Sequence, residues 1–362
     1  MMYTGDKYMQ GSMRGAMLPG NSTVKMGDFP IPTPGHGQVL VKMKACTICG
    51  SDIRAIYREH TGKGAEGYID GKIAGHEPCG QVVEEGPGVR RFHKGSRVII
   101  YHISGCGVCH DCRMGYMISC SSPLRAAYGW QRDGGMAEYL LADEKDCVEL
   151  PDSLSYADGA QVACGFGTVY EALEKIGISG NDNVLITGLG PVGLAAAMLC
   201  RAMGAQKIIG VELIDERIEL AKKLKLVDIV LKPSDSTVQQ ILDATNGKGC
   251  EKAIDASAND AARQIAVRGT RQWGTVALVG EGNTLSINPS PDMIHPQKTI
   301  IGSWVTSIWR MEDLVERLVR WNIHPDVLIT HRFPLEKADE AYALMASGHC
   351  GKVAVCFDEE LK

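Results

Sequence analysis

Four cysteines within fifteen residues constrain this chain more than any other feature of its sequence. Cys106, Cys109, Cys112 and Cys120 follow the spacing C-x2-C-x2-C-x7-C. Four thiolates at this spacing can surround one tetrahedral zinc ion at about 2.3 Å each, which leaves no coordination position for a substrate. Independent core cysteines would be spaced at helical or strand intervals, and disulfides would need an oxidising compartment. The segment at about 104–122 is therefore predicted to be a structural zinc lobe.

A second set of possible metal ligands is spread over the sequence. Cys49 stands in ACTICGSD, His76 in AGHEP and Cys164 in VACGFGTVYEA. Three protein ligands are typical of a catalytic zinc, whose fourth position stays open for substrate. Taken singly, the cysteines would be small core residues and the histidine a hydrogen-bonded loop residue. Taken together, the three residues favour an open zinc site.

Length and composition suit a globular protein of two domains. The chain has 362 residues, of which 44% are hydrophobic and 22% charged. A net charge of -5 argues against nucleic acid or an anionic membrane as a partner and leaves a small molecule as the expected one. We find neither the apolar core of a signal peptide nor an apolar stretch long enough for a membrane span. The cysteines outside the two sets show no paired pattern, so we expect a cytoplasmic protein.

The texture of the sequence changes near residue 156. From about 13 to 151, short alternating apolar runs separated by Gly and Pro predict antiparallel strands. Beyond 156, helical periods alternate with short buried strands, which predicts a parallel sheet wound by crossover helices. After about 302, the tail supplies two helices and a closing strand, KVAVCF. Residues 1–11 resemble a disordered lead-in.

The motif GLGPVG follows a predicted strand and opens a predicted helix, as a dinucleotide-binding turn does. Gly188 would allow the tight turn, Gly190 would let the backbone approach a pyrophosphate, and Gly193 would let helix and strand pack closely. Pro191 and Val192 complete the predicted cofactor-binding loop. The alternative is a tight turn that serves packing only.

Glu212 ends the next predicted strand, KIIGVE. A carboxylate at this point accepts hydrogen bonds from the adenosine ribose hydroxyls and repels a 2′-phosphate, so NAD is favoured over NADP. Arg217, one turn into the following helix, could stack on the adenine or could be a solvated surface residue.

These motifs together resemble those of the zinc-containing medium-chain alcohol dehydrogenases, of the polyol and threonine dehydrogenase kind. The match runs from about 13 to 357 and includes the four-cysteine lobe, C-G-S-D at 49–52, G-H-E at 75–77, D-G-G-x-A-E-Y at 133–139 and the dinucleotide motif. The resemblance implies an α/β protein with two domains. A GroES-like β-rich catalytic domain would comprise 1–165 and 303–362, and a Rossmann doubly wound parallel sheet domain would comprise 166–302.

The resemblance also implies roles at the metal. Cys49, His76 and Cys164 would be the protein ligands of the catalytic zinc. Glu77 would be a carboxylate that can approach the metal or replace a ligand. Asp52 would orient the His76 imidazole and raise its basicity, although it could also be a turn aspartate.

Further roles concern the proton and the cofactor. Ser51 would pass the alcohol's proton outward, and Thr168 would press on the nicotinamide ring. Many family members carry a histidine as the outer proton acceptor where this chain has Arg54, and arginine cannot accept a proton. His60 or His102 could replace it, or the proton could leave through the cofactor ribose.

The implied activity is the reversible, NAD-linked oxidation of a secondary alcohol to a ketone, with two zinc ions per chain, one catalytic and one structural. A polyol, cyclitol or amino alcohol is the expected substrate, and a homodimer or homotetramer the expected assembly. Two alternatives are a zinc-independent reductase of activated double bonds and a non-catalytic zinc and nucleotide-binding protein. The cysteine ligands and the lobe argue against the first, and the intact site residues argue against the second.

Overall fold

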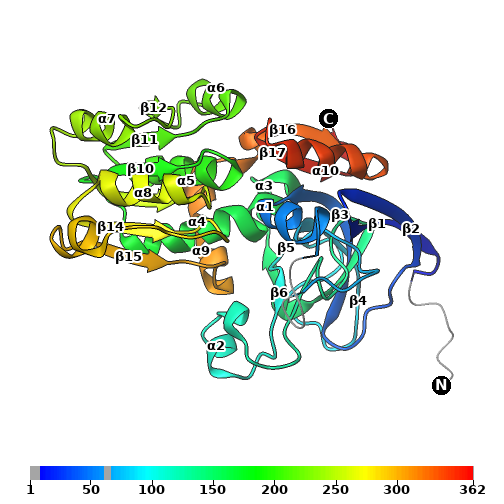
Figure 1. The fold of residues 1–362 in the computed structure, drawn as a ribbon. Helices are drawn as coiled ribbons and strands as arrows, with labels where there is room; N and C mark the ends of the chain where they lie inside the picture. The colour runs from blue at the N-terminus through cyan, green and yellow to red at the C-terminus, as the bar shows by residue number, and fades with distance from the viewer. Residues whose placement is uncertain (1–8, 61–66, 362) are drawn as a thin grey trace, which may run out of the picture. The chain divides into compact units, whose positions relative to one another are not determined.

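The computed structural model describes residues 9–60 and 67–361 (Figure 1). Most of the expected disordered lead-in, residues 1–8, lies outside the described residues. The chain divides into two compact units. Unit 1 comprises 1–164, 307–347 and 352–362, and unit 2 comprises 165–306 and 348–351. The domains expected from the sequence, 1–165 with 303–362 and 166–302, are meant as parts of the chain that fold independently. Their boundaries remain predictions.

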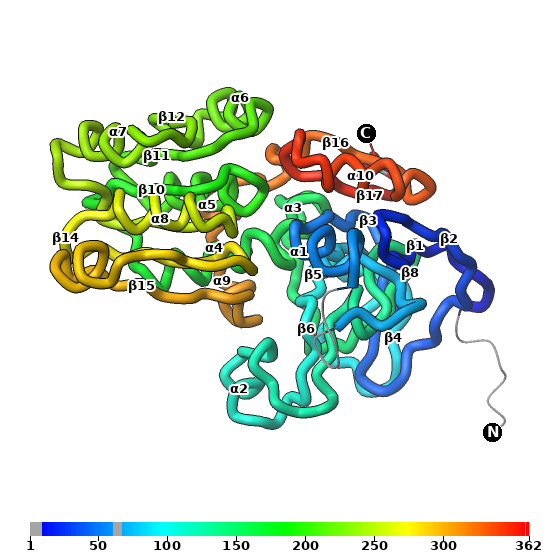
Figure 2. Tube along the Cα trace, in the orientation of Figure 1, coloured from blue at the N-terminus to red at the C-terminus, as the bar shows by residue number. Residues whose placement is uncertain are grey.

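Unit 1 is built on a mostly antiparallel sheet that has seven strands among the described residues. Its order is β16-β17-β3-β4-β5-β9, and β8 also pairs with β3. The strands are β3 (Gln38–Ile48), β4 (Glu77–Glu85), β5 (Arg97–Ile100), β8 (Tyr139–Asp143), β9 (Cys147–Glu149), β16 (Ile329–Phe333) and β17 (Lys352–Cys356). The closing strand β17 runs antiparallel to β3, and the two lie side by side in Figure 2. Segments from both ends of the sequence therefore form the centre of this sheet.

Apolar residues of β3 explain why it lies in the middle of unit 1. Val39, Val41 and Met43 are fully buried and pack in one cluster with Val98 and Tyr128. Leu40, which lies between Val39 and Val41 and so points to the other face, is also fully buried. A strand with both faces covered reads as a nearly continuous apolar run, as QVLVKMKACTI does.

Smaller elements complete unit 1. Strands β1 (Ser12–Gly20) and β2 (Thr23–Pro30) form a hairpin, and β6 (Ile103–Ser104) pairs with β7 (Ala126–Ala127). The helices are α1 (Gly50–Asp52), α2 (His110–Arg113), α3 (Tyr156–Gln161), α9 (Ile308–Trp321) and α10 (Ala338–Ser347). The two helices and the closing strand predicted for the tail are present, together with β16, which was not predicted.

Unit 2 contains a parallel sheet with six strands in the described part of the chain, in the order β12-β11-β10-β13-β14-β15. The strands are β10 (Asn183–Thr187), β11 (Lys207–Val211), β12 (Ile229–Leu231), β13 (Cys250–Asp255), β14 (Thr270–Leu278) and β15 (Thr299–Gly302). The helices are α4 (Gly167–Ile176), α5 (Pro191–Ala202), α6 (Asp215–Lys223), α7 (Thr237–Ala244) and α8 (Asp260–Gly269). This arrangement confirms the predicted α/β fold with a doubly wound parallel sheet.

The strand order reverses between β10 and β13, because the chain moves outward to β12 and then returns to the other side of β10. Such a switch point is where open parallel sheets bind their ligands, at the carboxyl ends of the strands. The GLGPVG turn follows β10 and therefore lies at this point. None of the helices in the described segments is long and apolar enough to cross a bilayer.

Close packing in the glycine turn depends on the absence of a side chain at Gly193. A Cβ atom built there would lie 1.8 Å from the carbonyl oxygen of Gly188. Gly188 itself has a φ of 85°, which glycine adopts with little strain. The first turn of α5 is thus packed directly onto the loop that precedes it.

We predict that Gly193→Ala lowers the free energy of unfolding by about 2 kcal/mol through this clash. Without the clash, alanine inside a helix would be favoured by about 1 kcal/mol. The control is Gly302→Ala, since a Cβ at Gly302 meets no described atom within 4 Å. Thermal unfolding followed by circular dichroism would measure both variants. Equal midpoints for the two would contradict the prediction.

Candidate metal centres and dinucleotide turn

The structure brings the predicted open metal site together within unit 1. Ligand atoms of Cys49, His76, Glu77 and Cys164 all lie within 4.8 Å of one another. Thr47 of β3 pairs with Glu77 of β4, so the residues that follow β3 and precede β4 are neighbours. Cys164 comes from a π-helical segment, η5 (Val162–Phe166), a rare conformation that is frequent at functional sites.

A buried carboxylate orients the histidine of this site. His76 Nδ1 donates to Asp52 Oδ1 at 2.7 Å, and the backbone N–H of Cys49 donates to Asp52 Oδ2 at 3.0 Å. Asp52 is fully buried. Because Nδ1 carries the proton, the lone pair of Nε2 is available to a metal. Ser51 Oγ lies 3.4 Å from Nε2, so its hydroxyl stands beside the position that a metal would take.

Electrostatic interactions suit a cation at this site. Burial lowers the pKa of His76, but the charge and the hydrogen bond of Asp52 raise it, so the net pKa lies well above its usual value. A hydrogen bond from Cys164 lowers the pKa of the Cys49 thiol well below its usual value. Thiolate is the form of cysteine that binds metal. Two sulfurs, an imidazole nitrogen and a nearby carboxylate form a donor set that fits zinc.

Glu77 is held by two residues that sequence reasoning missed. Its Oε2 accepts a hydrogen bond from Thr47 Oγ1 at 2.6 Å and lies 2.5 Å from Lys352 Nζ. All three side chains are buried. Burial lowers the pKa of Lys352, but Glu77 and Cys49 raise it, so the amine stays charged. A lysine at the start of the apolar run KVAVCF was the available signal.

His102 lies next to the open metal site. Its Nδ1 donates to the carbonyl oxygen of Ala163 at 2.8 Å, and its ring centroid is 5.1 Å from that of His76. Burial lowers the pKa of His102 to about 3, so the imidazole is neutral. Trp130 meets His76 edge to face, with 6.4 Å between ring centroids.

His60, the other histidine considered as a proton acceptor, is bound within its own part of the structure. Its Nε2 lies 2.9 Å from the carbonyl oxygen of Leu18, and its Nδ1 lies 3.3 Å from Asp70 Oδ1. Both ring nitrogens therefore have structural partners, which makes His60 a poor relay group. Arg54 is exposed in the π-helical segment η1 (Ile53–Tyr57).

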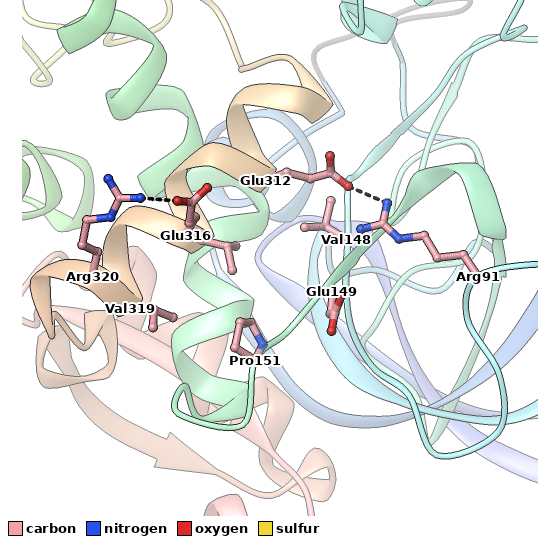
Figure 3. A pocket seen from close by; sticks show the side chains of 9 residues that line it. Arg91, Val148, Glu149, Pro151, Glu312, Glu316, Val319 and Arg320 are labelled. Carbon is pink, nitrogen blue, oxygen red and sulfur yellow. Dashed lines mark hydrogen bonds and ion pairs between the residues drawn. The ribbon is translucent and has the colours of Figure 1, made fainter.

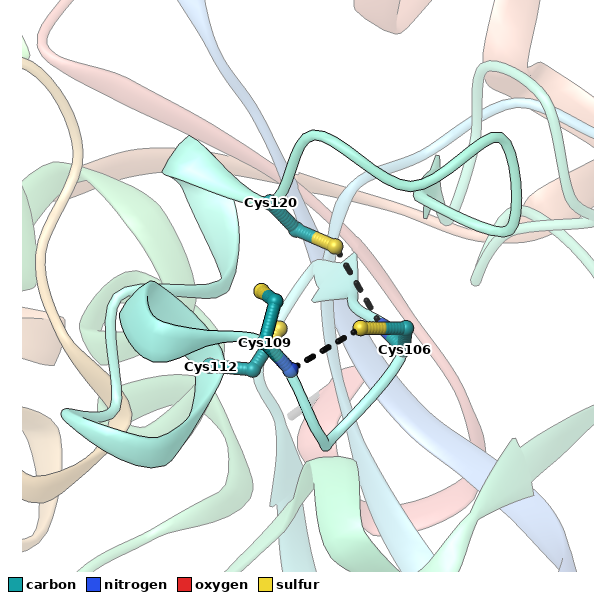
Figure 4. Close-up of side chains that lie close together, drawn as sticks. All are labelled: Cys106, Cys109, Cys112 and Cys120. Atoms are coloured by element: carbon teal, nitrogen blue, oxygen red, sulfur yellow. Dashed lines mark hydrogen bonds between the residues drawn. The ribbon is translucent and has the colours of Figure 1, made fainter.

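The four lobe cysteines also come together, with their sulfur atoms within 4.8 Å of one another (Figure 4). The backbone N–H of Cys106 donates to Cys120 Sγ, and that of Cys109 donates to Cys106 Sγ, each at 3.4 Å. Hydrogen bonds from backbone amides lower the pKa of Cys106 to about 6. Amides aimed at sulfur favour thiolate, so this donor set fits a closed four-cysteine zinc site.

The predicted dinucleotide turn of unit 2 has the expected local geometry. Gly190 is the N-cap of α5, and Pro191 and Val192 are its first residues. Pro at the first helical position needs no hydrogen-bond partner for its nitrogen. The helix N-terminus carries a partial positive charge, which suits a pyrophosphate. Thr168 lies, half-buried, in the first turn of α4.

Glu212 is fixed against the glycine turn by backbone amides. Its Oε2 accepts from Leu189 N at 2.7 Å, and its Oε1 accepts from the N–H groups of Leu213 and Ile214 at 2.7 and 3.0 Å. Arg217 Nη1 lies 3.8 Å from Glu212 Oε2, with 18% of the arginine side chain exposed. Glu212 and Arg217 thus lie together beside the turn.

A surface groove in unit 1 is lined by residues other than those of the two metal sites (Figure 3). Val148, Val315 and Val319 contribute apolar side chains, while Arg91 forms an ion pair with Glu312 at 2.7 Å. No residue that lines the groove belongs to either cysteine set.

We predict that Asp52→Asn weakens zinc binding at the open site by about 10- to 100-fold, as loss of a ligand's hydrogen-bond partner typically does. The amide keeps the size of the side chain but removes the charge that supports His76. Competition with a chelator would measure the loss, with the lobe zinc as an internal reference. Asp28→Asn, at an exposed carboxylate, is the control. Parent-like retention in Asp52→Asn would contradict the prediction.

Comparison with known proteins identifies the family. The alcohol dehydrogenase GroES-like domain matches residues 35–152, and the zinc-binding dehydrogenase domain matches residues 191–320. An uncharacterized zinc-type alcohol dehydrogenase-like protein, YphC of Escherichia coli K12, is 50% identical over 96% of this chain and 99% of its own length. An L-threonine 3-dehydrogenase of Pyrococcus abyssi is 33% identical over 90% of this chain and 93% of its own.

Solved structures agree with these matches. A short chain alcohol dehydrogenase from E. coli CFT073, complexed with NADH, has a TM-score of 0.84 at 26% identity and covers 96% of this chain and 99% of its own. A protein described as a zinc-binding dehydrogenase from Sinorhizobium meliloti 1021, bound to NADP, has a TM-score of 0.85 at 26% identity, with coverage of 96% and 100%. The chain is thus an oxidoreductase that acts on alcohols with zinc and a nicotinamide cofactor. It belongs to the zinc-containing medium-chain alcohol dehydrogenases, as the sequence motifs predicted.

Proposed function

We propose that this protein is an NAD-dependent enzyme with two zinc ions per chain that reversibly oxidises a secondary alcohol to a ketone. The observation that carries the proposal is the convergence of Cys49, His76 and Cys164 beside the Ser51 hydroxyl. Three ligands leave one position for the substrate oxygen. The four lobe cysteines would hold the second ion as a structural element.

The residues of the open site would divide the work of proton removal. Zinc, when bound, supplies Lewis acidity that lowers the pKa of the substrate hydroxyl. Ser51 is placed to accept the released proton, because its oxygen stands beside His76 Nε2. Asp52 keeps the proton of His76 on Nδ1 and so keeps Nε2 directed at the metal. The nicotinamide cofactor, when bound beside the GLGPVG turn, would supply the acceptor for the hydride of the substrate carbon.

The outer proton acceptor would not be His60, because both of its nitrogens are engaged with Leu18 and Asp70. His102 has its Nδ1 proton committed to Ala163. We infer that the proton passes from Ser51 through the cofactor ribose to water.

The preference for NAD rests on Glu212. A 2′-phosphate beside this carboxylate would suffer charge repulsion, whereas ribose hydroxyls could donate to it. The carboxylate is held in place by three backbone N–H groups, so it cannot easily turn away. Arg217, 3.8 Å from Glu212 Oε2, offsets part of the negative charge and reduces this repulsion.

A polyol, cyclitol or amino alcohol is the proposed substrate class. The similarity to an L-threonine 3-dehydrogenase supports an amino alcohol in particular. A homodimer or homotetramer is the proposed assembly, because β15 is the edge strand of its sheet and its Ile300 and Ile301 are only half-buried. Such an edge can pair with a second copy across a two-fold axis.

We predict that a panel of sugar alcohols, inositols, aminocyclitols, diols and threonine contains a substrate that is oxidised faster with NAD than with NADP. Absorbance of the reduced cofactor would report turnover, and metal analysis would report two zinc ions per chain. Failure of every compound with both ions bound would overturn the substrate class. A preference for NADP would overturn the role given to Glu212.

Two cysteine variants should separate the two metal sites. Cys164→Ala should abolish turnover and leave one zinc per chain while the thermal midpoint changes little, because the residue serves the reaction. Cys112→Ala should also lose one zinc but should lower the thermal midpoint, because it opens the structural lobe. Parent-level activity in Cys164→Ala would refute the assigned ligand set.

A further inference from the structure

We propose that Lys352 and Thr47 act together as a latch that holds the Glu77 carboxylate off the open position of the metal centre. The inference rests on the proposed function, since it assumes that Cys49, His76 and Cys164 bind the catalytic ion. It assigns positioning roles to two residues that stand outside the ligand set.

The geometry places Glu77 between two competing partners. One of its carboxylate oxygens falls within the group of ligand atoms that lie within 4.8 Å of one another, so the residue is near enough to become a fourth ligand. Its Oε2, however, is bound by Thr47 Oγ1 at 2.6 Å and by Lys352 Nζ at 2.5 Å. The two partners reach Glu77 from neighbouring strands, β3 and β17. Both bind the same oxygen.

Because Glu77 is buried away from water, its contacts determine where its carboxylate can lie. Thr47 and Glu77 are fully buried, and Lys352 is 2% exposed. A buried carboxylate needs a cation or strong hydrogen bonds near it. The Lys352 ammonium supplies positive charge to Glu77, and a zinc ion held by the neighbouring ligands would supply more.

Charge counting gives the direction of the effect. Two thiolates balance the charge of a zinc ion, and Lys352 balances Glu77. Removing the lysine would leave the carboxylate uncompensated and would favour its binding to zinc. A site with two sulfurs, one nitrogen and one carboxylate oxygen is closed, like a structural site, and leaves no position for substrate.

The test uses full-length, zinc-loaded protein and Lys352→Met. We expect the chelator 4-(2-pyridylazo)resorcinol to remove zinc from the open site about tenfold more slowly than in the parent, while the lobe zinc is unaffected. A residue that merely supports the site would give the opposite result, because loss of an outer partner typically weakens metal binding by about 10- to 100-fold. Zinc release that is unchanged or faster in Lys352→Met would overturn the proposal.

A second measurement uses Co²⁺ in place of the catalytic zinc, with imidazole as a probe of the fourth position. We expect imidazole to change the visible Co²⁺ spectrum of the parent and of Lys352→Arg at similar concentrations. Lys352→Met should need a concentration about tenfold higher, and Thr47→Val should show a smaller shift in the same direction. Parent-like imidazole binding in Lys352→Met would count against the latch. Circular dichroism would show whether Lys352→Met is folded. If it is unfolded, the imidazole measurement on Thr47→Val tests the proposal instead.

Two control variants isolate the cause. In Lys352→Met/Glu77→Gln the neutral amide has no charge to drive it to the metal, so imidazole binding should return to the parent value. A double variant that behaves like Lys352→Met would exclude Glu77 as the blocking group. Lys44→Met removes a lysine of the same sheet, which pairs with Asp358 at 2.9 Å, and should leave zinc release unchanged. These metal readouts need no alcohol, so they can fail or succeed independently of the proposed activity.

Discussion

Pairing of buried charges at one end of β3, β4 and β17 is the constraint on which the metal unit depends. Backbone pairing of the strands aligns Thr47 of β3 with Glu77 of β4, and Ile48 of β3 with Val353 of β17. Side chains alternate along a strand, so a slip of one residue would turn Thr47 and Lys352 to the opposite face. The apolar core of β3 resists such a slip, since Val41 and Met43 would leave their cluster. Ordinary packing of Val and Met thereby fixes the position of the reactive groups.

The buried charges beside the open metal site are neutralised by neighbouring charges and not by water. Asp52 is matched by His76, and Glu77 is matched by Lys352, with at most a few per cent of each side chain exposed. Each pair costs desolvation free energy that apolar residues would not, so pairs of this kind are weak evidence for stability. Their value here is orientation, because each carboxylate is held by two donors in a defined direction. Unit 2 uses a carboxylate in a similar way, since Glu212 is held by backbone amides beside the glycine turn.

Local motifs made much of this structure predictable. The four lobe cysteines lie within one short segment, and the GLGPVG turn lies within another. Chain geometry alone therefore brings the atoms of each motif together. Residue types suggested Cys49, His76 and Cys164 as one open site, but their assignment as ligands of a catalytic zinc came from the resemblance to a family, because distant residues meet only through the sheet. Lys352 and Thr47 belong to no motif. The lysine at the start of the apolar run KVAVCF was a signal of a buried charge, but its meeting with Thr47 and Glu77 depends on strand order. The binding of His60 to Leu18 and Asp70 was unpredictable for the same reason.

The late position of β17 in the sequence has a consequence for biosynthesis. Thr47 and Glu77 are made early, but the lysine that balances Glu77 is the first residue of β17, the last of the described strands. Residues 165–306, nearly all of unit 2, leave the ribosome before it. Until β17 has been made, the sheet around the ligands lacks an internal strand and holds an unbalanced carboxylate. A chain that stopped before β17 would therefore carry every predicted zinc ligand but no complete site to hold the ion.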